Sequence, residues 1–215
     1  ENYINRVTKG VYEFGSVFKT FTLAAAIHEK AVEPETQFKN LEKSIQCGKN
    51  TISEYDKKIP SDLTAEQILI RSGNIGSVRI AQAIGLEKFK NFLDKLSLIS
   101  AIKFDIEEVG VPIPFRWGKC KLATTSYGHG ITTTILQLAN AYSIIVNGGY
   151  KINPTLIKKK SKIKNKKILN NDVSKKINPI LRKIVTTKEG TASLANVDGY
   201  QVGGKTGTAQ TSIVG

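Results

Sequence analysis

Ser16 and Lys19 have residue types and a spacing that could support nucleophilic catalysis. They lie three positions apart at the predicted start of an apolar helix, so their side chains share one helix face. A lysine amine can accept the proton of a serine hydroxyl when burial and nearby positive charge lower the pKa of the lysine. The same Ser-x-x-Lys string begins at Ser100 and at Ser161, where no apolar helix follows. Taken alone, the string at Ser16 is better explained by a helix N-cap.

Ser72 and Asn74 flank a glycine in the one Ser-x-Asn string of the chain, 56 residues after Ser16. The string falls between two predicted helices, where a turn could direct both side chains into a cleft. There the hydroxyl could relay a proton, and the amide could hold a substrate carbonyl or the lysine amine. The alternative is that the string caps the helix that begins at Ile75.

Lys205, Thr206, Gly207 and Thr208 contain the one Lys-Thr-Gly string, 133 residues after Ser72, on a predicted strand. Alternation along a strand places Lys205 and Gly207 on one face and the two threonines on the other. A cation with two hydroxyls suits an anionic carboxylate, and the glycine lets a ligand backbone lie close to the strand. The alternative is an ordinary end of an edge strand.

The order and spacing of these three motifs resemble those of the penicillin-binding protein and serine β-lactamase superfamily. The flanking segments 5–8, 12–19, 126–131, 136–139 and 203–210 resemble class B penicillin-binding proteins, with the closest fit to the septal cell-division transpeptidases. Three positions depart from that pattern. Phe14 and Ile135 stand where the family usually has proline, and Gly73 stands where it more often has serine. None of these departures removes a reacting group.

The resemblance implies a mechanism that agrees with the residue types. Ser16 would attack the penultimate D-Ala carbonyl of a peptidoglycan stem peptide ending in D-Ala-D-Ala, and Lys19 would accept its proton. Ser72, with Lys205 nearby, would relay a proton to the departing D-Ala. An amine from a neighbouring stem peptide would then attack the acyl-enzyme and complete the cross-link.

The same resemblance assigns the binding groups. Asn74 would orient the catalytic lysine and the substrate amide. Thr206 and Thr208 would hold the terminal carboxylate beside Gly207, and the backbone N–H groups of Ser16 and Thr208 would form an oxyanion hole. β-Lactams resemble the D-Ala-D-Ala terminus and would trap Ser16 as a stable ester. No cofactor and no metal are implied.

For partners, the resemblance implies stem peptides, β-lactam antibiotics and cell-division membrane proteins, and no nucleic acid. It implies a location at the periplasmic face of the bacterial inner membrane, at the division septum, with an anchoring segment outside this sequence. The chain holds no Met and no uninterrupted apolar run of 18 residues. The resemblance also implies that residues 1–215 are part of a transpeptidase domain whose first and last sheet strands are missing, so these residues are expected to be unstable or poorly active alone.

Three other functions remain open. A class A β-lactamase needs a glutamate that activates water, but no Glu-x-x-Leu-Asn string lies between Asn74 and Lys205, so a transpeptidase is favoured over a hydrolase. A non-catalytic scaffold of a cell-wall complex would keep the fold, and the intact motifs argue against it. The net charge of +14 could attract nucleic acid, but only five arginines occur and no nucleic-acid-binding signature is present. Seven lysines lie between Lys158 and Lys167, which is predicted to be a solvated loop or hairpin tip.

The elements that must position the motifs indicate an α+β (mixed α/β) fold. The resemblance adds an antiparallel sheet flanked by helices and a helical subdomain. Helices are predicted over residues 17–31, 64–70, 75–84, 86–96, 134–146 and 173–186. Strands are predicted over residues 43–47, 51–53, 155–157, 167–169 and 199–209, and residues 101–125 are predicted to be an extended connection.

Four local features sharpen these predictions. Thr64 opens a capping box, and Pro179 lies inside the last predicted helix, which is expected to start late or to kink. Cys47 and Cys120 match no zinc spacing. They are expected to be free buried thiols, although a disulfide stays open because sequence cannot give their separation. His129 lies between two glycines and is expected to shape a loop near the cleft.

Overall fold

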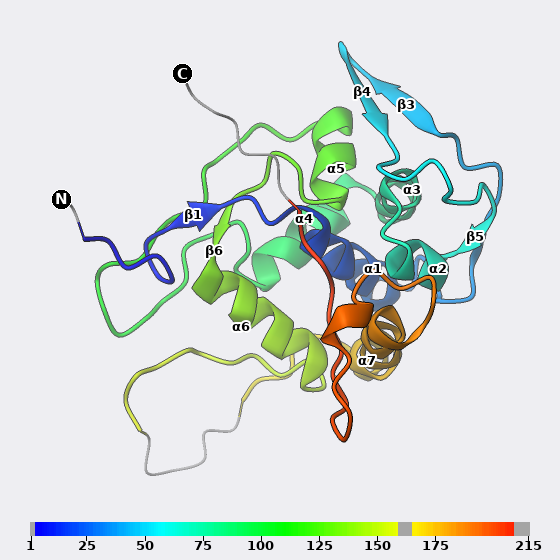
Figure 1. The fold of residues 1–215 in the computed structure, drawn as a ribbon. Coiled ribbons are helices and arrows are strands. Elements are labelled where there is room, and N and C mark those ends of the chain that lie inside the picture. Colours follow the sequence, from blue (N-terminus) through cyan, green and yellow to red (C-terminus); the bar gives the residue numbers. More distant parts are fainter. Residues whose placement is uncertain (1–2, 159–164, 209–215) are drawn as a thin grey trace.

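A computed structural model describes residues 3–158 and 165–208 (Figure 1). The helices of the described chain pack around one buried helix, with short strand pairs at the margins. The helical segments are η1 (Gly15–Val17), α1 (Phe18–His28), α2 (Ala65–Ile70), α3 (Asn74–Ile84), α4 (Leu86–Lys95), α5 (Lys119–Ser126), α6 (Ile135–Val146), α7 (Asn171–Thr186) and η2 (Ser193–Ala195). The strands are β1 (Val11–Tyr12), β2 (Gln37–Phe38), β3 (Ser44–Cys47), β4 (Asn50–Ser53), β5 (Leu63–Thr64) and β6 (Thr133–Thr134).

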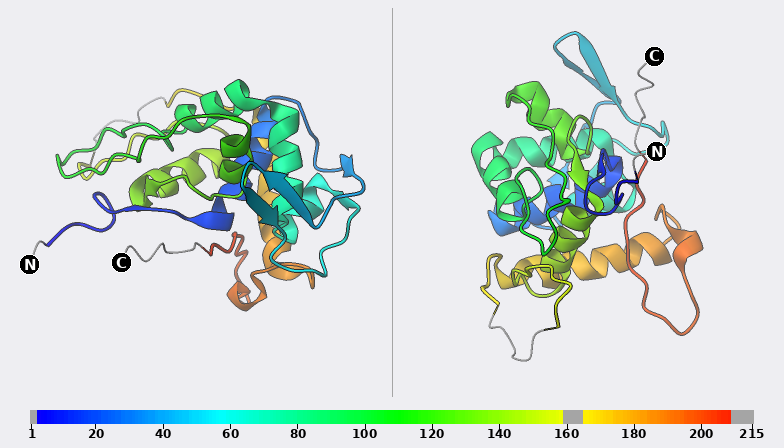
Figure 2. Two further views of the ribbon diagram at one scale, coloured as in Figure 1. Left: turned by 90° about the horizontal axis from the view of Figure 1, so that it is seen from above. Right: turned by 90° about the vertical axis from the view of Figure 1, so that its left-hand side faces the viewer.

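Helix α1 is the centre of the core. Every residue from Phe18 to Ile27 is buried, which explains why this helix is apolar on nearly all faces. Helices α2, α3, α4, α5 and α7 all contact it, and Figure 2 shows them gathered around it. Lys19 is the one charged residue among these ten buried positions, so the fold holds a lysine where a hydrocarbon side chain would normally lie.

The described strands pair only in twos. β1 pairs with β6, β2 with β5, and β3 with β4, all antiparallel. The β3–β4 hairpin, predicted from sequence, projects from the helical body (Figures 1 and 2). The β1–β6 pair brings the segment before Ser16 against the start of α6, with Val11 opposite Thr134.

Most predicted helices are confirmed, and their caps explain their boundaries. The capping box at Thr64 is present: its hydroxyl accepts from the Gln67 N–H at 3.1 Å, and the Gln67 side chain accepts from the Thr64 N–H at 2.9 Å. Helix α7 does not start late: it begins at Asn171 and continues through Pro179 to Thr186. Asn170 caps it, and its apolar face is buried against the core. This packing offsets the backbone hydrogen bond that proline cannot make.

Three predictions about extended segments are wrong. The connection over residues 101–125 ends in helix α5, which begins at Lys119. Residues 155–157 form no strand, and the Leu156 N–H and the Thr155 hydroxyl donate to the Asp105 carboxylate instead. Residues 167–169 contribute only one bridge, between Tyr150 and Lys167. Of the lysine-rich run, positions 159–164 lie outside the described residues.

The predicted last strand is also absent from the part of it that the structure describes, residues 199–208. Residues 201–208 carry no regular secondary structure, and the Gly204 N–H donates to the Leu181 carbonyl of α7 at 3.1 Å. A strand requires a neighbouring strand that completes a ladder of hydrogen bonds. No described segment pairs with this one, and Ala209 lies outside the described residues.

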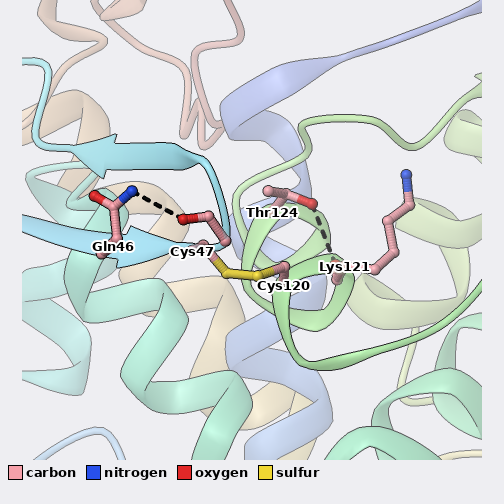
Figure 3. Close-up of a disulfide and its surroundings, with 6 residues drawn as sticks. Gln46, Cys47, Cys120, Lys121 and Thr124 are labelled. Atoms are coloured by element: carbon pink, nitrogen blue, oxygen red, sulfur yellow. Dashed lines mark hydrogen bonds between the residues drawn. A yellow bond between two sulfur atoms is a disulfide. The ribbon is translucent and has the colours of Figure 1, made fainter.

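The prediction of two free, buried cysteines is wrong. Cys47 at the end of β3 and Cys120 at the start of α5 form a disulfide, with their Cα atoms 5.4 Å apart (Figure 3). Cys120 is exposed, and Cys47 is half-buried. A sequence separation of 73 residues holds no information about this contact, which arises because the hairpin folds back onto α5.

Candidate active site

The principal cleft among the described residues has a volume of about 730 Å³. It collects residues from all three motifs and from two additional walls. From the motifs come Ser16, Ser72, Asn74, Thr206 and Thr208. The walls add Glu13, Gly15, Thr51, Ile52, Ser53, Tyr55, Tyr127, Gly128, His129 and Thr191. Segments separated by more than 100 residues therefore meet at one opening.

Ser16 lies in the 3₁₀ turn η1, immediately before α1, and its side chain borders the cleft. Lys19 is the second residue of α1, three positions after Ser16, a spacing at which helical residues are neighbours on one face. Gly15 has a φ of 54°, and a Cβ on Gly128 would lie 1.9 Å from the Gly15 carbonyl oxygen. The tight turn that presents Ser16 thus requires a glycine in the turn itself, Gly15, and another in the facing loop, Gly128.

Lys19 is only 1% exposed and contacts the second motif directly. Its Nζ donates to the Ser72 carbonyl oxygen at 2.5 Å and to the Ser72 Oγ at 3.2 Å. Burial, followed by the positive charge of Lys205, lowers the pKa of Lys19 from its ordinary 10.5 to about 7, while Glu54 acts in the opposite direction. Near neutral pH, Lys19 can therefore act as a proton acceptor.

Ser72 is held in a left-handed backbone conformation, with φ of 60°. It follows the C-cap of α2: the Ser72 N–H donates to the Leu69 carbonyl at 3.2 Å, and the Gly73 N–H donates to the Ile68 carbonyl at 2.9 Å. This is the pattern of a Schellman motif, in which glycine normally takes the left-handed position. A serine there costs about 1–2 kcal/mol. The turn directs both the carbonyl and the hydroxyl of Ser72 to Lys19.

Lys205 reaches Ser72 from the third motif. Its Nζ donates to the Ser72 Oγ at 2.8 Å and to the Thr206 carbonyl at 3.1 Å. Burial lowers the pKa of Lys205 to about 8. The Thr206 hydroxyl lies 2.7 Å from that of Thr191, a cleft residue that the sequence patterns did not indicate. Thr208 completes this side of the cleft.

Gly207 brings the third motif against the turn that carries Ser16. A Cβ on Gly207 would lie 2.6 Å from Val17 Cγ2 and 2.8 Å from the Phe14 carbonyl oxygen. The missing side chain therefore permits close packing of two chain segments. This contact sets the distance between the Lys-Thr-Gly segment and Ser16.

Asn74 begins helix α3 and lines the cleft, but its amide is turned to the hairpin. Its Nδ2 donates to the Ser53 carbonyl at 2.8 Å. The Glu54 carboxylate accepts from the Asn74 N–H at 2.7 Å and from the Ile75 N–H at 2.9 Å, so it caps α3. No sequence signal identified Glu54, because its partners lie 20 and 21 residues away.

The loop after α5 forms another wall of the cleft. Tyr127, Gly128 and His129 line it, and the His129 ring stacks on Tyr127 with centroids 6.2 Å apart. His129 Nδ1 lies 3.7 Å from the Glu13 carboxylate. The structure thus places His129 in a loop at the cleft, as expected.

Within the described ranges, no group of three or more His, Cys, Asp or Glu side chains could hold a metal ion. Nor, in those ranges, does any helix combine the length and apolarity needed to cross a membrane.

Comparison with known proteins places this geometry in a family. The penicillin binding protein transpeptidase domain matches residues 1–213. A probable peptidoglycan D,D-transpeptidase FtsI of Caulobacter vibrioides is 30% identical over 212 residues, which cover 96% of this chain and 36% of that protein. The stage V sporulation protein D of Bacillus subtilis is 33% identical over 215 residues, covering 93% of this chain and 33% of that protein. The chain spans about a third of the length of these relatives.

Solved structures give the same result for the fold. The transpeptidase domain of penicillin-binding protein 3 from Burkholderia pseudomallei has a TM-score of 0.89 and 27% identity, covering 98% of this chain and 64% of that one. A structure described as a peptidoglycan glycosyltransferase from Burkholderia ambifaria has a TM-score of 0.88 and 28% identity, covering 97% of this chain and 66% of that one. The predicted mixed α/β transpeptidase fold is confirmed. The chain belongs to the penicillin-binding protein transpeptidase domain family.

Proposed function

We propose that this chain is a serine D,D-transpeptidase that cross-links peptidoglycan stem peptides through an acyl-enzyme on Ser16. One observation carries the proposal. Lys19, with a pKa of about 7, and Lys205 both donate to the hydroxyl of Ser72, which lies with Ser16 in one cleft. Such a set of groups can take a proton from a nucleophile and return one to a leaving group.

In the acylation step, Ser16 Oγ attacks the carbonyl carbon of the penultimate D-Ala. Its proton passes to the neutral amine of Lys19, and the developing oxyanion is held by the backbone N–H groups of Ser16 and Thr208. When the C–N bond breaks, Ser72 donates its proton to the departing D-Ala nitrogen and is reprotonated by Lys205. The products are the Ser16 ester and free D-Ala.

Substrate binding uses the remaining groups. Thr206 and Thr208 hold the terminal carboxylate near the charge of Lys205, and Gly207 keeps this segment close to the nucleophile. Asn74 orients the substrate amide, with its own position set by Ser53 and Glu54. The expected contact of Asn74 with Lys19 is not among the hydrogen bonds of the described residues, where Lys19 donates to Ser72 instead. In the second step, a stem-peptide amine attacks the ester and loses a proton through Ser72 to the neutral amine of Lys205. Ser16 leaves with the proton held by Lys19, and the cross-link forms with both lysines restored. β-Lactams enter the same cleft and acylate Ser16.

The proposal extends to septal wall synthesis at the periplasmic face of the inner membrane, with cell-division membrane proteins as partners and a membrane anchor elsewhere in the natural protein. The residues around the three motifs support this assignment, as does a relative named FtsI. A fluorescent fusion of the natural protein should gather at midcell. Cells that carry only the Ser16→Ala variant should become filamentous. A uniform side-wall signal would argue for a role in elongation instead.

Labelling with a fluorescent penicillin tests the chemistry. In the full-length natural protein, the wild type should retain one covalent label, and Ser16→Ala should retain none. Ser100→Ala is a matched control, because Ser100 begins another Ser-x-x-Lys string and only its carbonyl is used, by Gln137. Labelling that persists in Ser16→Ala would refute the nucleophile, and its absence in the wild type would favour a non-catalytic scaffold. A label lost within seconds would instead indicate a hydrolase.

A further inference from the structure

The Cys47–Cys120 disulfide joins two walls of the cleft that the proposed mechanism does not connect. Cys47 ends strand β3 of the hairpin, whose second strand contributes Thr51, Ile52 and Ser53 to the cleft. Cys120 lies in the first turn of α5, and the loop that follows α5 contributes three other lining residues. Figure 3 shows the bond running from the hairpin to the helix.

The α5 wall is anchored to the core independently of the disulfide. The Thr22 hydroxyl of α1 donates to the Ser126 carbonyl at 2.7 Å, and both residues are buried. Gly128 lies directly against Gly15 in the turn that carries Ser16. Because α1 forms the centre of the core, this wall has a fixed position relative to the nucleophile.

The hairpin wall has much weaker attachment. β3 and β4 pair with each other and with no other described strand, and Ile52 is their one buried side chain. An isolated two-stranded hairpin is marginally stable in water. The covalent bond to α5 therefore restrains the turn end of this hairpin, whose other end is hydrogen-bonded to α3.

The hairpin in turn holds a residue of the second motif. The Ser53 carbonyl accepts from the Asn74 amide at 2.8 Å, and the next residue, Glu54, caps the N-terminus of the helix on which Asn74 lies. A hairpin that moves displaces its lining residues and the Asn74 side chain together. The reacting groups Ser16 and Lys19 are on η1 and α1 and would stay in place.

We propose that the Cys47–Cys120 disulfide is a positioning element of the cleft: it clamps the hairpin wall to the α5 wall and thereby orients Asn74 for substrate binding. The inference rests on the proposed function, since it assigns the bond a role in binding the same substrates. Cys47 and Cys120 touch no reacting atom and act through Ser53 and Glu54.

The test measures acylation by fluorescent penicillin over a range of concentrations, which separates the dissociation constant of the first complex from the acylation rate constant. Reduction with a phosphine, or Cys47→Ser with Cys120→Ser, should raise the dissociation constant roughly tenfold and leave the rate constant and the labelled fraction nearly unchanged. The phosphine should have no effect on the double variant. Bridging the reduced thiols with diiodomethane, which forms S–CH2–S and releases two HI, should restore tight binding.

A role limited to global stability predicts a different result. Ile177→Ala deletes buried volume in α7, away from the cleft, and is the matched destabilised control. Like that control, a purely structural disulfide would lower the labelled fraction at an unchanged dissociation constant, and this outcome would overturn the proposal. The proposal would also be overturned if protein with both thiols shown to be reduced had the same dissociation constant as the oxidised protein. Two free thiols in protein that was never exposed to a reductant would overturn it as well.

A second readout separates this proposal from the proposed function. Amide hydrogen exchange at Thr51–Ser53 and at Asn74 should accelerate on reduction, whether or not the protein is acylated. If oxidised wild-type protein is never acylated, the proposed function fails, and accelerated exchange still supports the clamp. Unchanged exchange at these amides after reduction overturns the clamp.

Discussion

The ammonium of Lys205 donates to the hydroxyl oxygen of Ser72 at 2.8 Å, although 133 positions separate the two residues. Lys19 donates to the same oxygen at 3.2 Å. A hydroxyl oxygen has two lone pairs, so both are used when both lysines donate. The proton of Ser72 must then point elsewhere, where it is available to a group bound in the cleft. This arrangement supports the proposed role of Ser72 as a proton donor.

The rate of acylation by a β-lactam should depend on pH as a narrow bell. The rate rises as Lys19 loses its proton, because only the neutral amine accepts from Ser16, and the pKa of Lys19 is about 7. It falls as Lys205 is deprotonated, with a pKa of about 8. Because Lys19 and Lys205 interact, the two limbs of the bell give apparent pKa values of the coupled pair and not of either lysine alone. Second-order acylation rates from about pH 5 to about pH 10 test this, and a rate that still rises at the alkaline end would contradict it.

Glu54→Gln should move the acid limb of that bell to lower pH. The Glu54 carboxylate raises the pKa of Lys19, so removing its charge lets Lys19 lose its proton more easily. The same change weakens the cap of α3 by about 1 kcal/mol. Asp56→Asn is the matched control, because Asp56 caps the Lys58 N–H and does not act on Lys19. Equal acid limbs in wild type and Glu54→Gln would show that the charge has no influence on Lys19.

Ser72→Ala and Ser72→Gly should differ in stability and agree in activity. Both remove the hydroxyl that accepts from Lys19 and Lys205, so both should lower the acylation rate by roughly 100-fold or more. Glycine adopts the left-handed conformation of residue 72 without strain, so Ser72→Gly should be about 1 kcal/mol more stable than Ser72→Ala. Urea unfolding of the two variants measures the difference. A glycine variant that is the less stable of the two would mean that residue 72 is not strained.

Gly207→Ala should impair acylation while Gly204→Ala should not. The new Cβ at residue 207 meets Val17 and the Phe14 carbonyl at less than 3 Å, which forces the Lys-Thr-Gly segment away from the nucleophile turn. A displacement of about 1 Å can reduce a rate roughly 100-fold. At Gly204 no atom lies within 4 Å of an added Cβ, and its N–H bond to Leu181 is preserved. Comparable acylation rates in the two variants would count against the close contact.

Several parts of the fold and site were predictable from sequence because their causes are local. The capping box at Thr64, the hairpin around Gly48 and the apolar helix after Ser16 each depend on residues within a few positions of one another. The extended segment at residues 201–208 was a misleading case, because its β-like pattern is local but a strand also needs a partner.

The order of residues along the chain is enough to identify the candidate reactive groups of this protein and to predict that Ser16 and Asn74 lie beside helix starts. Only the tertiary structure decided that Lys19 is buried with a lowered pKa, that Lys205 reaches Ser72, that Glu54 caps α3, and that Cys47 meets Cys120. The physical reason is the distance along the chain between the residues that interact. Caps, turns and helix faces arise from neighbours along the chain, whereas desolvation and contacts across 20 to 133 residues exist only after the whole chain has packed.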